Sequence, residues 1–219
     1  MTASDLYLKQ VEIGPMENFV YFVGSKNTRE VFVVDPAWQA DTILKMAREE
    51  DLKIVGALIS HYHFDHTNGI EELLESVSCP VYVHKDDVPY LGFASDHVVG
   101  TESGQRLKAG DVEIEAVHTP GHTPGSQCFH VRGHLISGDT LFIGACGRTD
   151  LPGGDATQLY HSLTQKLMKF DDTTVLCPGH NYSDRPTTTM GQEKKTNPYL
   201  ICDSLQNFLK FRTGVSEAR

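Results

Sequence analysis

The sequence has no surplus of basic residues and no long apolar run. Acidic residues outnumber basic ones by 29 to 19 among 219 residues, which gives a net charge of −10. Such a surface repels phosphate backbones, so general nucleic-acid binding is not expected. No run approaches the roughly 18 apolar residues of a membrane span, and the start MTASDLYLKQ lacks the basic and apolar regions of a secretory signal. We expect a cytoplasmic protein without nucleic-acid or membrane partners.

Cysteine pairs at redox or zinc-binding spacing are also missing. The five cysteines are odd in number and far apart, and none forms C-x-x-C. This pattern favours free thiols in a reducing cytoplasm over a disulfide framework.

Internal repeats, low-complexity runs and Pro/Ser-rich linkers are absent as well. We therefore interpret residues 1–219 as a single domain. With 39% hydrophobic and 22% charged residues, the chain has the composition of a globular protein with a sizeable core.

Short apolar stretches between Gly, Asn and Asp predict interleaved strands and helices. The strands are expected at 6–13, 18–23, 30–35, 53–60, 80–85, 112–118 and 173–178, with a hairpin over 126–137 that turns at Arg132-Gly133. The helices are expected at 39–51, 70–77, 155–170 and 197–211. The strand-rich start favours two facing sheets with helices outside, an α+β four-layer αββα sandwich, over a Rossmann sheet.

Histidine and aspartate are concentrated in SHYHFDHTNG (60–69), directly after a predicted buried strand. In an extended chain, residues two apart point the same way, so His61, His63 and Asp65 are expected to converge. His66 would join them as the chain turns toward the helix near Gly69. Convergent nitrogen and oxygen donors at this spacing are typical of a metal site.

Three later segments carry further donors in Gly/Pro turns, each after a predicted strand. VHTPGHTPGS (117–126) carries His118 and His122, ISGDTLF (136–142) carries Asp139, and CPGHNY (177–182) carries His180. Because turns at strand ends present side chains at the rim of a fold, these donors could complete the site.

H-x-H-x-D-H, G-H-T-P-G-S, G-D-T-L-F and P-G-H-N-Y, in that order, resemble the metallo-β-lactamase superfamily and its glyoxalase II (hydroxyacylglutathione hydrolase) branch of short members. The resemblance runs from Asn18 to Tyr199 and implies the αββα fold. It implies that His61, His63 and His122 hold one metal ion, that Asp65, His66 and His180 hold a second, and that Asp139 bridges both. The G-H-T match favours His122 over His118. The remaining histidines are expected on the surface or in structural roles: His84, His97, His130, His134 and His161.

An all-nitrogen-and-oxygen ligand set without thiolate indicates an open, catalytic site. Two divalent ions are expected, zinc first, with iron and manganese as alternatives. A metal-bridging hydroxide, oriented by Asp65 as the catalytic residue, would attack the substrate carbonyl. A thiol leaves without a strong acid because its pKa is near 8.5, so a thioester fits better than an amide or a β-lactam.

Substrate recognition is expected from Arg148 and Tyr182, which match the basic and phenolic glutathione-binding positions of the glyoxalase II group. Arg148 could instead form a salt bridge with Asp150 or Asp155. Full-length glyoxalase II enzymes carry a helical C-terminal region with further glutathione contacts, but only 39 residues follow His180 here. Acyl-carrier and coenzyme A thioesters are therefore alternative substrates to glutathione thioesters.

A persulfide dioxygenase is the alternative enzyme. That group shares the fold and the histidine motifs and has a loop that resembles GRTD (147–150), and its single iron would be held by His61, His122 and Asp139. PGHNY and GDTLF favour the hydrolase. A non-catalytic binding module is a weaker third interpretation, because every expected ligand position is filled. The sequence does not predict an oligomeric state.

Overall fold

The computed structural model describes residues 5–94 and 96–213. The N-terminal half builds a sheet in the order β1-β2-β3-β4-β5-β6, from β1 (Leu6–Ile13), β2 (Asn18–Ser25), β3 (Glu30–Val34), β4 (Lys53–Leu58), β5 (Val81–His84) and β6 (Val98–Thr101). Its helices are α1 (Ala40–Glu49), α2 (Phe64–Thr67), α3 (Ile70–Ser76) and the 3-10 turn η2 (Val88–Tyr90). The first three strands are antiparallel, and β3 to β6 run parallel.

The C-terminal half builds a second sheet in the order β14-β13-β10-β9-β8-β7. Its strands are β7 (Arg106–Ala109), β8 (Val112–His118), β9 (Gln127–Val131), β10 (His134–Gly138), β13 (Val175–Pro178) and β14 (Thr188–Thr189), with a separate small hairpin of β11 (Leu141–Phe142) and β12 (Ala145–Cys146). The helices are α4 (Ala156–His161), η3 (Ser162–Lys166), η4 (Leu167–Lys169), α5 (Met190–Thr196) and α6 (Leu205–Thr213).

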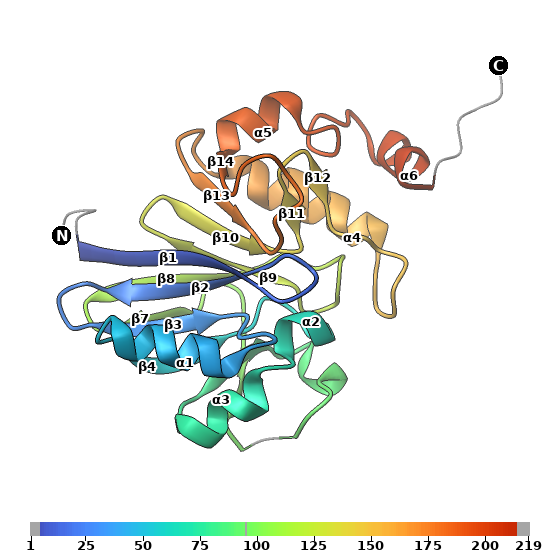
Figure 1. Cartoon of the computed structure of the whole chain (residues 1–219). Coiled ribbons are helices and arrows are strands. Elements are labelled where there is room, and N and C mark those ends of the chain that lie inside the picture. Colours follow the sequence, from blue (N-terminus) through green and yellow to red (C-terminus); the bar gives the residue numbers. More distant parts are fainter. Residues whose placement is uncertain (1–4, 95, 214–219) are drawn as a thin grey trace.

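The two sheets face each other, with α1 and α3 outside the first and α4, α5 and α6 outside the second (Figure 1). Three apolar clusters fill the spaces between the four layers. Alternate residues of β2 belong to two of these clusters: Phe22 packs toward the helices, whereas Phe19 and Tyr21 pack between the sheets. This double burial explains the continuous apolar runs in the strands. The predicted α+β four-layer αββα sandwich is confirmed.

The helix predicted over 155–170 begins as expected but changes pitch. Asp155 caps it, because its Oδ1 accepts hydrogen bonds from the backbone N–H groups of Thr157 and Gln158. The α-helical turns pass into a π-helical and then a 3-10 segment. The predicted stripe of leucines is fully buried under the second sheet all the same: Leu159, Leu163 and Leu167.

The prediction of a helix over 197–211 is wrong in its first half. Asn197 is extended, with φ −73° and ψ 116°, as is usual before a proline, and the chain stays irregular until α6 begins at Leu205. The Asn197 amide donates to the carbonyl oxygens of Phe142 and Ala145, so this segment braces the β11–β12 hairpin. The short elements β6, β7 and α5 were not predicted, because none has enough apolar periodicity to stand out.

The described ranges contain no helix that is long and apolar enough to cross a membrane. The five cysteines, all of which lie within those ranges, are free as predicted, and four of them are buried.

Candidate metal centre

All seven predicted ligand residues lie together, and each follows the end of a β-strand. His61 and His63 follow β4, and Asp65 and His66 lie on α2, one turn further on. The other three come from the second sheet: His122 after β8, Asp139 after β10 and His180 after β13. Segments far apart in the chain therefore meet at one edge of the sandwich, where α2 is seen in Figure 1.

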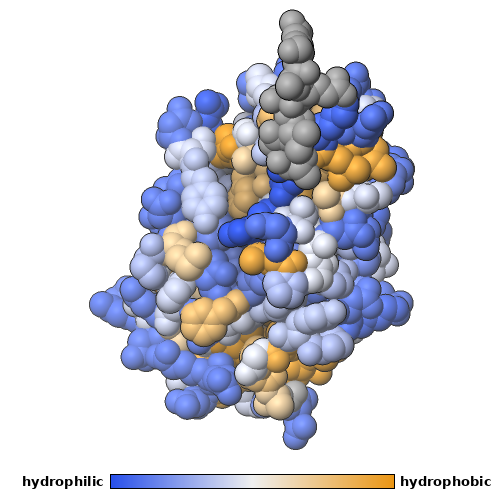
Figure 2. All heavy atoms as spheres, turned by 90° about the vertical axis from the view of Figure 1, so that its right-hand side faces the viewer, coloured by the Kyte–Doolittle hydropathy of each residue, from blue (hydrophilic) through white to orange (hydrophobic). Residues whose placement is uncertain are grey.

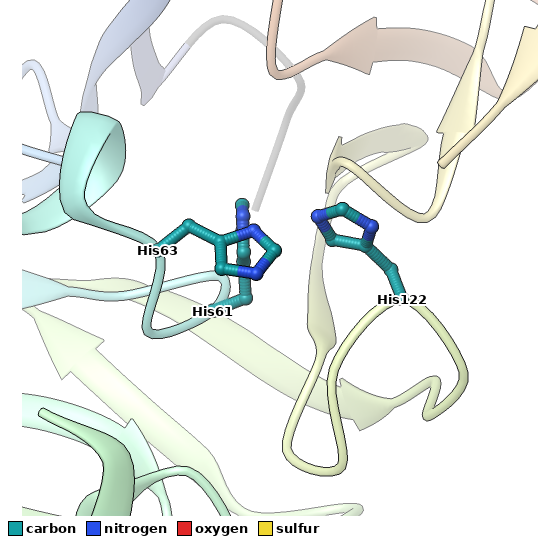
Figure 3. Close-up of side chains that lie close together, drawn as sticks. All are labelled: His61, His63 and His122. Carbon is teal, nitrogen blue, oxygen red and sulfur yellow. The ribbon is translucent and has the colours of Figure 1, made fainter. Parts of the chain in front are cut away.

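Three histidines form what we call the first triad: His61, His63 and His122. One ring nitrogen of each lies within 4.8 Å of those of the other two. Their ring centroids are 4.6–4.7 Å apart, and Figure 3 shows the three rings turned toward a common space. Three imidazoles that converge in this way could hold a divalent cation through their nitrogen lone pairs.

The second triad comprises Asp65, His66 and His180. The Nε2 atoms of the two histidines face each other at 3.1 Å, and Oδ2 of Asp65 is 3.4 Å from each. Two imidazole nitrogens at this distance need a cation or a proton between them, since their lone pairs would otherwise repel.

Asp139 lies between the two triads. Its Oδ1 is 3.4 Å from Nε2 of His66, and its Oδ2 is 3.6 Å from Nε2 of His122 and 3.4 Å from Nε2 of His180. A single carboxylate is thus within reach of donors from both groups, which is the position that a bridging ligand would need.

The unsatisfied polar atoms of the site fit metal ions well. In the described part of the chain, five buried side-chain nitrogen or oxygen atoms have no hydrogen-bond partner, and four belong to this site: Nε2 of His61, His63 and His122, and Oδ1 of Asp139. Unpaired buried polar atoms are costly, so such a cluster calls for an ion.

The opposite ring nitrogens are already engaged. In four ligand histidines, Nδ1 faces a hydrogen-bond acceptor. For His61 this is Ser60 Oγ and for His66 it is Asp35 Oδ2, both at 3.0 Å. For His122 it is the Arg148 carbonyl oxygen at 2.6 Å, and for His180 the Met16 carbonyl oxygen at 2.8 Å. These contacts select the tautomer whose Nε2 lone pair points into the site, as in metal-binding histidines.

The two triads differ in their electrostatics. Burial lowers the pKa of His61 and His122 and brings the pKa of His63 to about 4, so the first triad is neutral at pH 7. Burial would also lower the pKa of His180, but its hydrogen bonds with Asp139 and Asp65 raise that pKa to about 9. A cation entering the second triad therefore replaces a proton.

The comparisons with known proteins agree with this geometry. Residues 13–180 match the family model described as the metallo-beta-lactamase superfamily. The chain belongs to the metallo-beta-lactamase superfamily. A probable polyketide biosynthesis zinc-dependent hydrolase, BaeB of Bacillus velezensis, is 29% identical over 195 residues, which cover 89% of this chain and 87% of BaeB.

Two solved structures are also similar to this chain. ETHE1 from Myxococcus xanthus has a TM-score of 0.87 and 29% identity, with 97% of this chain and 92% of that chain covered. TTHA1623 in a di-iron-bound form has a TM-score of 0.78 and 32% identity, covering 88% of this chain and 100% of that one. Together with the ligand geometry, these matches support a metal-dependent hydrolase of the metallo-beta-lactamase superfamily that uses divalent ions.

The route by which Asp65 reaches the site differs from the prediction. The extended-chain argument applies to His61 and His63, but helical backbone begins at Phe64. Asp65 and His66 therefore enter on α2, where Oδ2 of Asp65 lies 3.4 Å and Nε2 of His66 3.1 Å from Nε2 of His180.

Arg148 and Tyr182 both lie beside the ligands. The Arg148 carbonyl accepts the Nδ1 proton of His122, while its exposed guanidinium forms two 2.7 Å hydrogen bonds with Asp150. Arg148 thus forms a salt bridge with Asp150, which was one of the two partners considered from the sequence. The other, Asp155, caps α4 instead. Tyr182 is 55% exposed and stacks on His180, with ring centroids 4.6 Å apart and planes at 9°.

His118 is placed away from the seven-residue site. Its ring is stacked on His84, with centroids 3.7 Å apart and planes at 10°, and its Nε2 is 2.9 Å from the Pro124 carbonyl. Although Asp86 brings a third ligand-type atom near this pair, in-plane lone pairs of parallel rings do not converge on one point. The stack is suited to packing.

Three buried polar residues around the ligands were not predicted: Asn18, Asp35 and Asp87. Asp35 accepts hydrogen bonds from the backbone N–H and hydroxyl of Ser60 and contacts Nδ1 of His66. The available signal was an aspartate directly after the buried strand EVFVV, where a carboxylate needs partners to be tolerated.

Proposed function

We propose that the chain hydrolyses thioesters with two divalent metal ions, zinc first and iron or manganese as alternatives. The observation that carries this proposal is the position of Asp139 between the two triads. The three Nε2 atoms of the first triad have no other partner, and the two imidazole nitrogens of the second face each other at 3.1 Å. When bound, such ions would polarise a substrate carbonyl and lower the pKa of water toward about 7. The seven proposed ligands are His61, His63, Asp65, His66, His122, Asp139 and His180.

Asp65 is the proposed catalytic residue, with a role as hydrogen-bond acceptor. Burial would raise the pKa of Asp65, but its hydrogen bonds with His180 and His66 outweigh burial and hold that pKa well below its usual range. Asp65 thus stays ionised at pH 7 and can orient the attacking water, but it has no proton to give to a leaving group.

The absence of a proton donor in Asp65 favours thioesters. A thiol leaves as a thiolate because its pKa is near 8.5, whereas an amine needs a proton from a general acid. The low pKa of a thiol leaving group thus supports the thioester specificity implied by the resemblance to the glyoxalase II group, and it disfavours an amide or a β-lactam as the substrate.

The surroundings of the ligands suit a substrate with apolar and anionic parts. Phe64, 72% exposed, lies on α2, and Arg148 and Tyr182 flank the ligands from the other side. Figure 2 shows the corresponding edge of the sandwich, where hydrophobic patches alternate with hydrophilic ones. Burial raises the pKa of Tyr182 to about 12, so its hydroxyl is a donor at pH 7. We propose that Arg148 binds a carboxylate and Tyr182 a carbonyl of a glutathione, acyl-carrier or coenzyme A thioester.

A mononuclear iron dioxygenase acting on persulfides is the second candidate. Its supporting observation is a two-histidine, one-carboxylate arrangement, since Oδ2 of Asp139 lies 3.6 Å from Nε2 of His122 and 4.0 Å from Nε2 of His61. The complete second triad favours the hydrolase, because a single iron ion held by His61, His122 and Asp139 would leave Asp65, His66 and His180 without a metal ion to bind.

Substrate assays with the metal-loaded protein distinguish the two candidates. Thiol release would be followed with a chromogenic thiol reagent on S-lactoylglutathione and on an acyl-coenzyme A, and dioxygen uptake on glutathione persulfide. We expect thiol release from at least one thioester and no oxygen uptake. Oxygen uptake on the persulfide without thiol release from either thioester would overturn the hydrolase proposal.

A further inference from the structure

Two buried polar side chains outside the ligand set tie together segments that carry ligands. Asp87 (0% exposed) follows β5, and Asn18 (2% exposed) begins β2. Neither residue is a proposed ligand, yet each contacts two of the ligand-bearing segments. Asp87 contacts chain neighbours of first-triad residues, whereas Asn18 contacts residues of the second triad.

Asp87 joins the two segments of the first triad. Its Oδ2 accepts hydrogen bonds from the backbone N–H of Tyr62, between His61 and His63, and from Thr123 Oγ1, next to His122, at 3.0 and 2.7 Å. Its Oδ1 accepts from the Gly125 N–H at 2.5 Å. A Cβ on Gly125 would lie 2.6 Å from Asp87 Cβ, so the close approach needs glycine at that position.

Asn18 joins the two segments of the second triad. Its Nδ2 donates to the backbone carbonyl and to Oδ2 of Asp65, both at 3.0 Å. Its backbone forms an isolated β-bridge with His180. The indole Nε1 of Trp38 donates to its Oδ1 at 2.7 Å and thereby fixes which end of the amide faces Asp65.

We propose that Asp87 and Asn18 are positioning residues that set the metal affinities of the two triads separately: Asp87 that of the first, and Asn18 that of the second. Residues that orient metal ligands typically change metal affinity by about 10–100-fold when altered. The inference rests on the two-metal part of the proposed function and goes beyond it, because it assigns separate control of the two ions.

Two parent variants isolate the triads and test that premise first. The double variant His66→Ala with His180→Ala keeps the first triad, and His63→Ala with His122→Ala keeps the second. Zn²⁺ affinity would be measured by competition with a chromogenic chelator. If either parent binds no Zn²⁺, the two-metal assignment itself fails, and that result is distinct from a failure of the positioning roles.

Asp87→Asn and Asn18→Leu are then added to each parent. The first substitution would present an amide N–H₂ to backbone and hydroxyl donors. The second would keep a similarly branched side chain but lose all three side-chain hydrogen bonds. We expect Asp87→Asn to weaken Zn²⁺ binding about 10–100-fold in the first-triad parent and less than about threefold in the other. Asn18→Leu should give the opposite pattern.

Two milder changes keep the test informative if a variant does not fold. Thr123→Val removes one hydrogen bond to Asp87, and Trp38→Phe removes the one to Asn18 Oδ1. Each should give a several-fold loss confined to the same triad as the stronger variant. Thermal unfolding of the metal-free variants provides the folding control.

A loss of Zn²⁺ affinity that is confined to one triad distinguishes a positioning role from a general contribution to stability. A purely structural role would lower the unfolding temperature and weaken both triads together. Equal losses in both parents, or unchanged affinity in both, would overturn the inference.

Discussion

Gly179 leaves the space that the Asp139 carboxylate occupies. A Cβ on Gly179 would overlap Asp139 Oδ1, the oxygen that lies 3.4 Å from His66 Nε2. The glycine before His180 is therefore a requirement of the site and not only of the turn.

Gly179→Ala should accordingly displace the Asp139 carboxylate. Overpacking costs about 1–3 kcal/mol, so we expect metal affinity to fall about ten- to a hundredfold, measured by chelator competition. Gly92→Ala is the matched control, because among the described residues no atom beyond its two chain neighbours lies within 4 Å of the added methyl group. Equal affinities of the two variants would contradict the proposed crowding at Asp139.

Asp139→Asn tests the bridge directly. Asparagine keeps the shape of the side chain but removes the anionic charge that two cations would share. We expect loss of at least one ion per chain and of nearly all hydrolysis, measured by elemental analysis and thiol release. Two retained ions with near-native turnover would show that Asp139 does not bridge them.

Arg148→Ala tests substrate recognition. A hydrogen bond to a charged group contributes about 1.5–3 kcal/mol, so kcat/KM on S-lactoylglutathione should fall about ten- to a hundredfold. A simple acyl thioester without the peptide should be unaffected. Arg185→Ala is the control, because Arg185 is another exposed arginine paired with a neighbouring aspartate. An equal loss on both substrates would mean that Arg148 supports its loop.

His84 should make stability depend on pH. Burial lowers the pKa of His84 from 6.5 to about 4. The unfolded chain therefore takes up the proton first, and the stability contributed by neutral His84 is present above pH 6.5 and lost as pH falls toward 4. The stability advantage of the native chain over His84→Gln, measured by urea unfolding with chelator present, should shrink over this range. A constant difference from about pH 7 to about pH 4 would contradict this.

The ligands could be predicted from the sequence because they follow strands in short Gly/Pro turns. His61 and His63 were placed together by strand geometry alone. The extended-chain argument ended at Phe64, where a single helical turn without apolar periodicity carries Asp65 and His66 inward. Assignment of each ligand to a triad came from motif resemblance, since no local rule links residue 61 to residue 122.

The supporting residues were beyond local sequence reasoning for a physical reason. The side-chain partners of Asp87 are 25 to 38 positions away, and Asn18 contacts Asp65 across 47 positions. Hydrogen bonds of that kind follow from how the strands are ordered, which periodicity does not encode. Long-range contacts also explain why α6 begins later than predicted. The apolar residues after 197 have helical spacing, but the proline after Asn197 and the hydrogen bonds from the Asn197 side-chain amide to the hairpin outweigh that preference.

Two ions per chain are proposed to act together on a thioester. The most direct test is to titrate the metal-free protein with Zn²⁺ while following thiol release from S-lactoylglutathione and from an acyl-coenzyme A. The rate on at least one of them should rise until two equivalents have been added and then level off. A plateau at one equivalent, or no thiol release at any ratio, would contradict it.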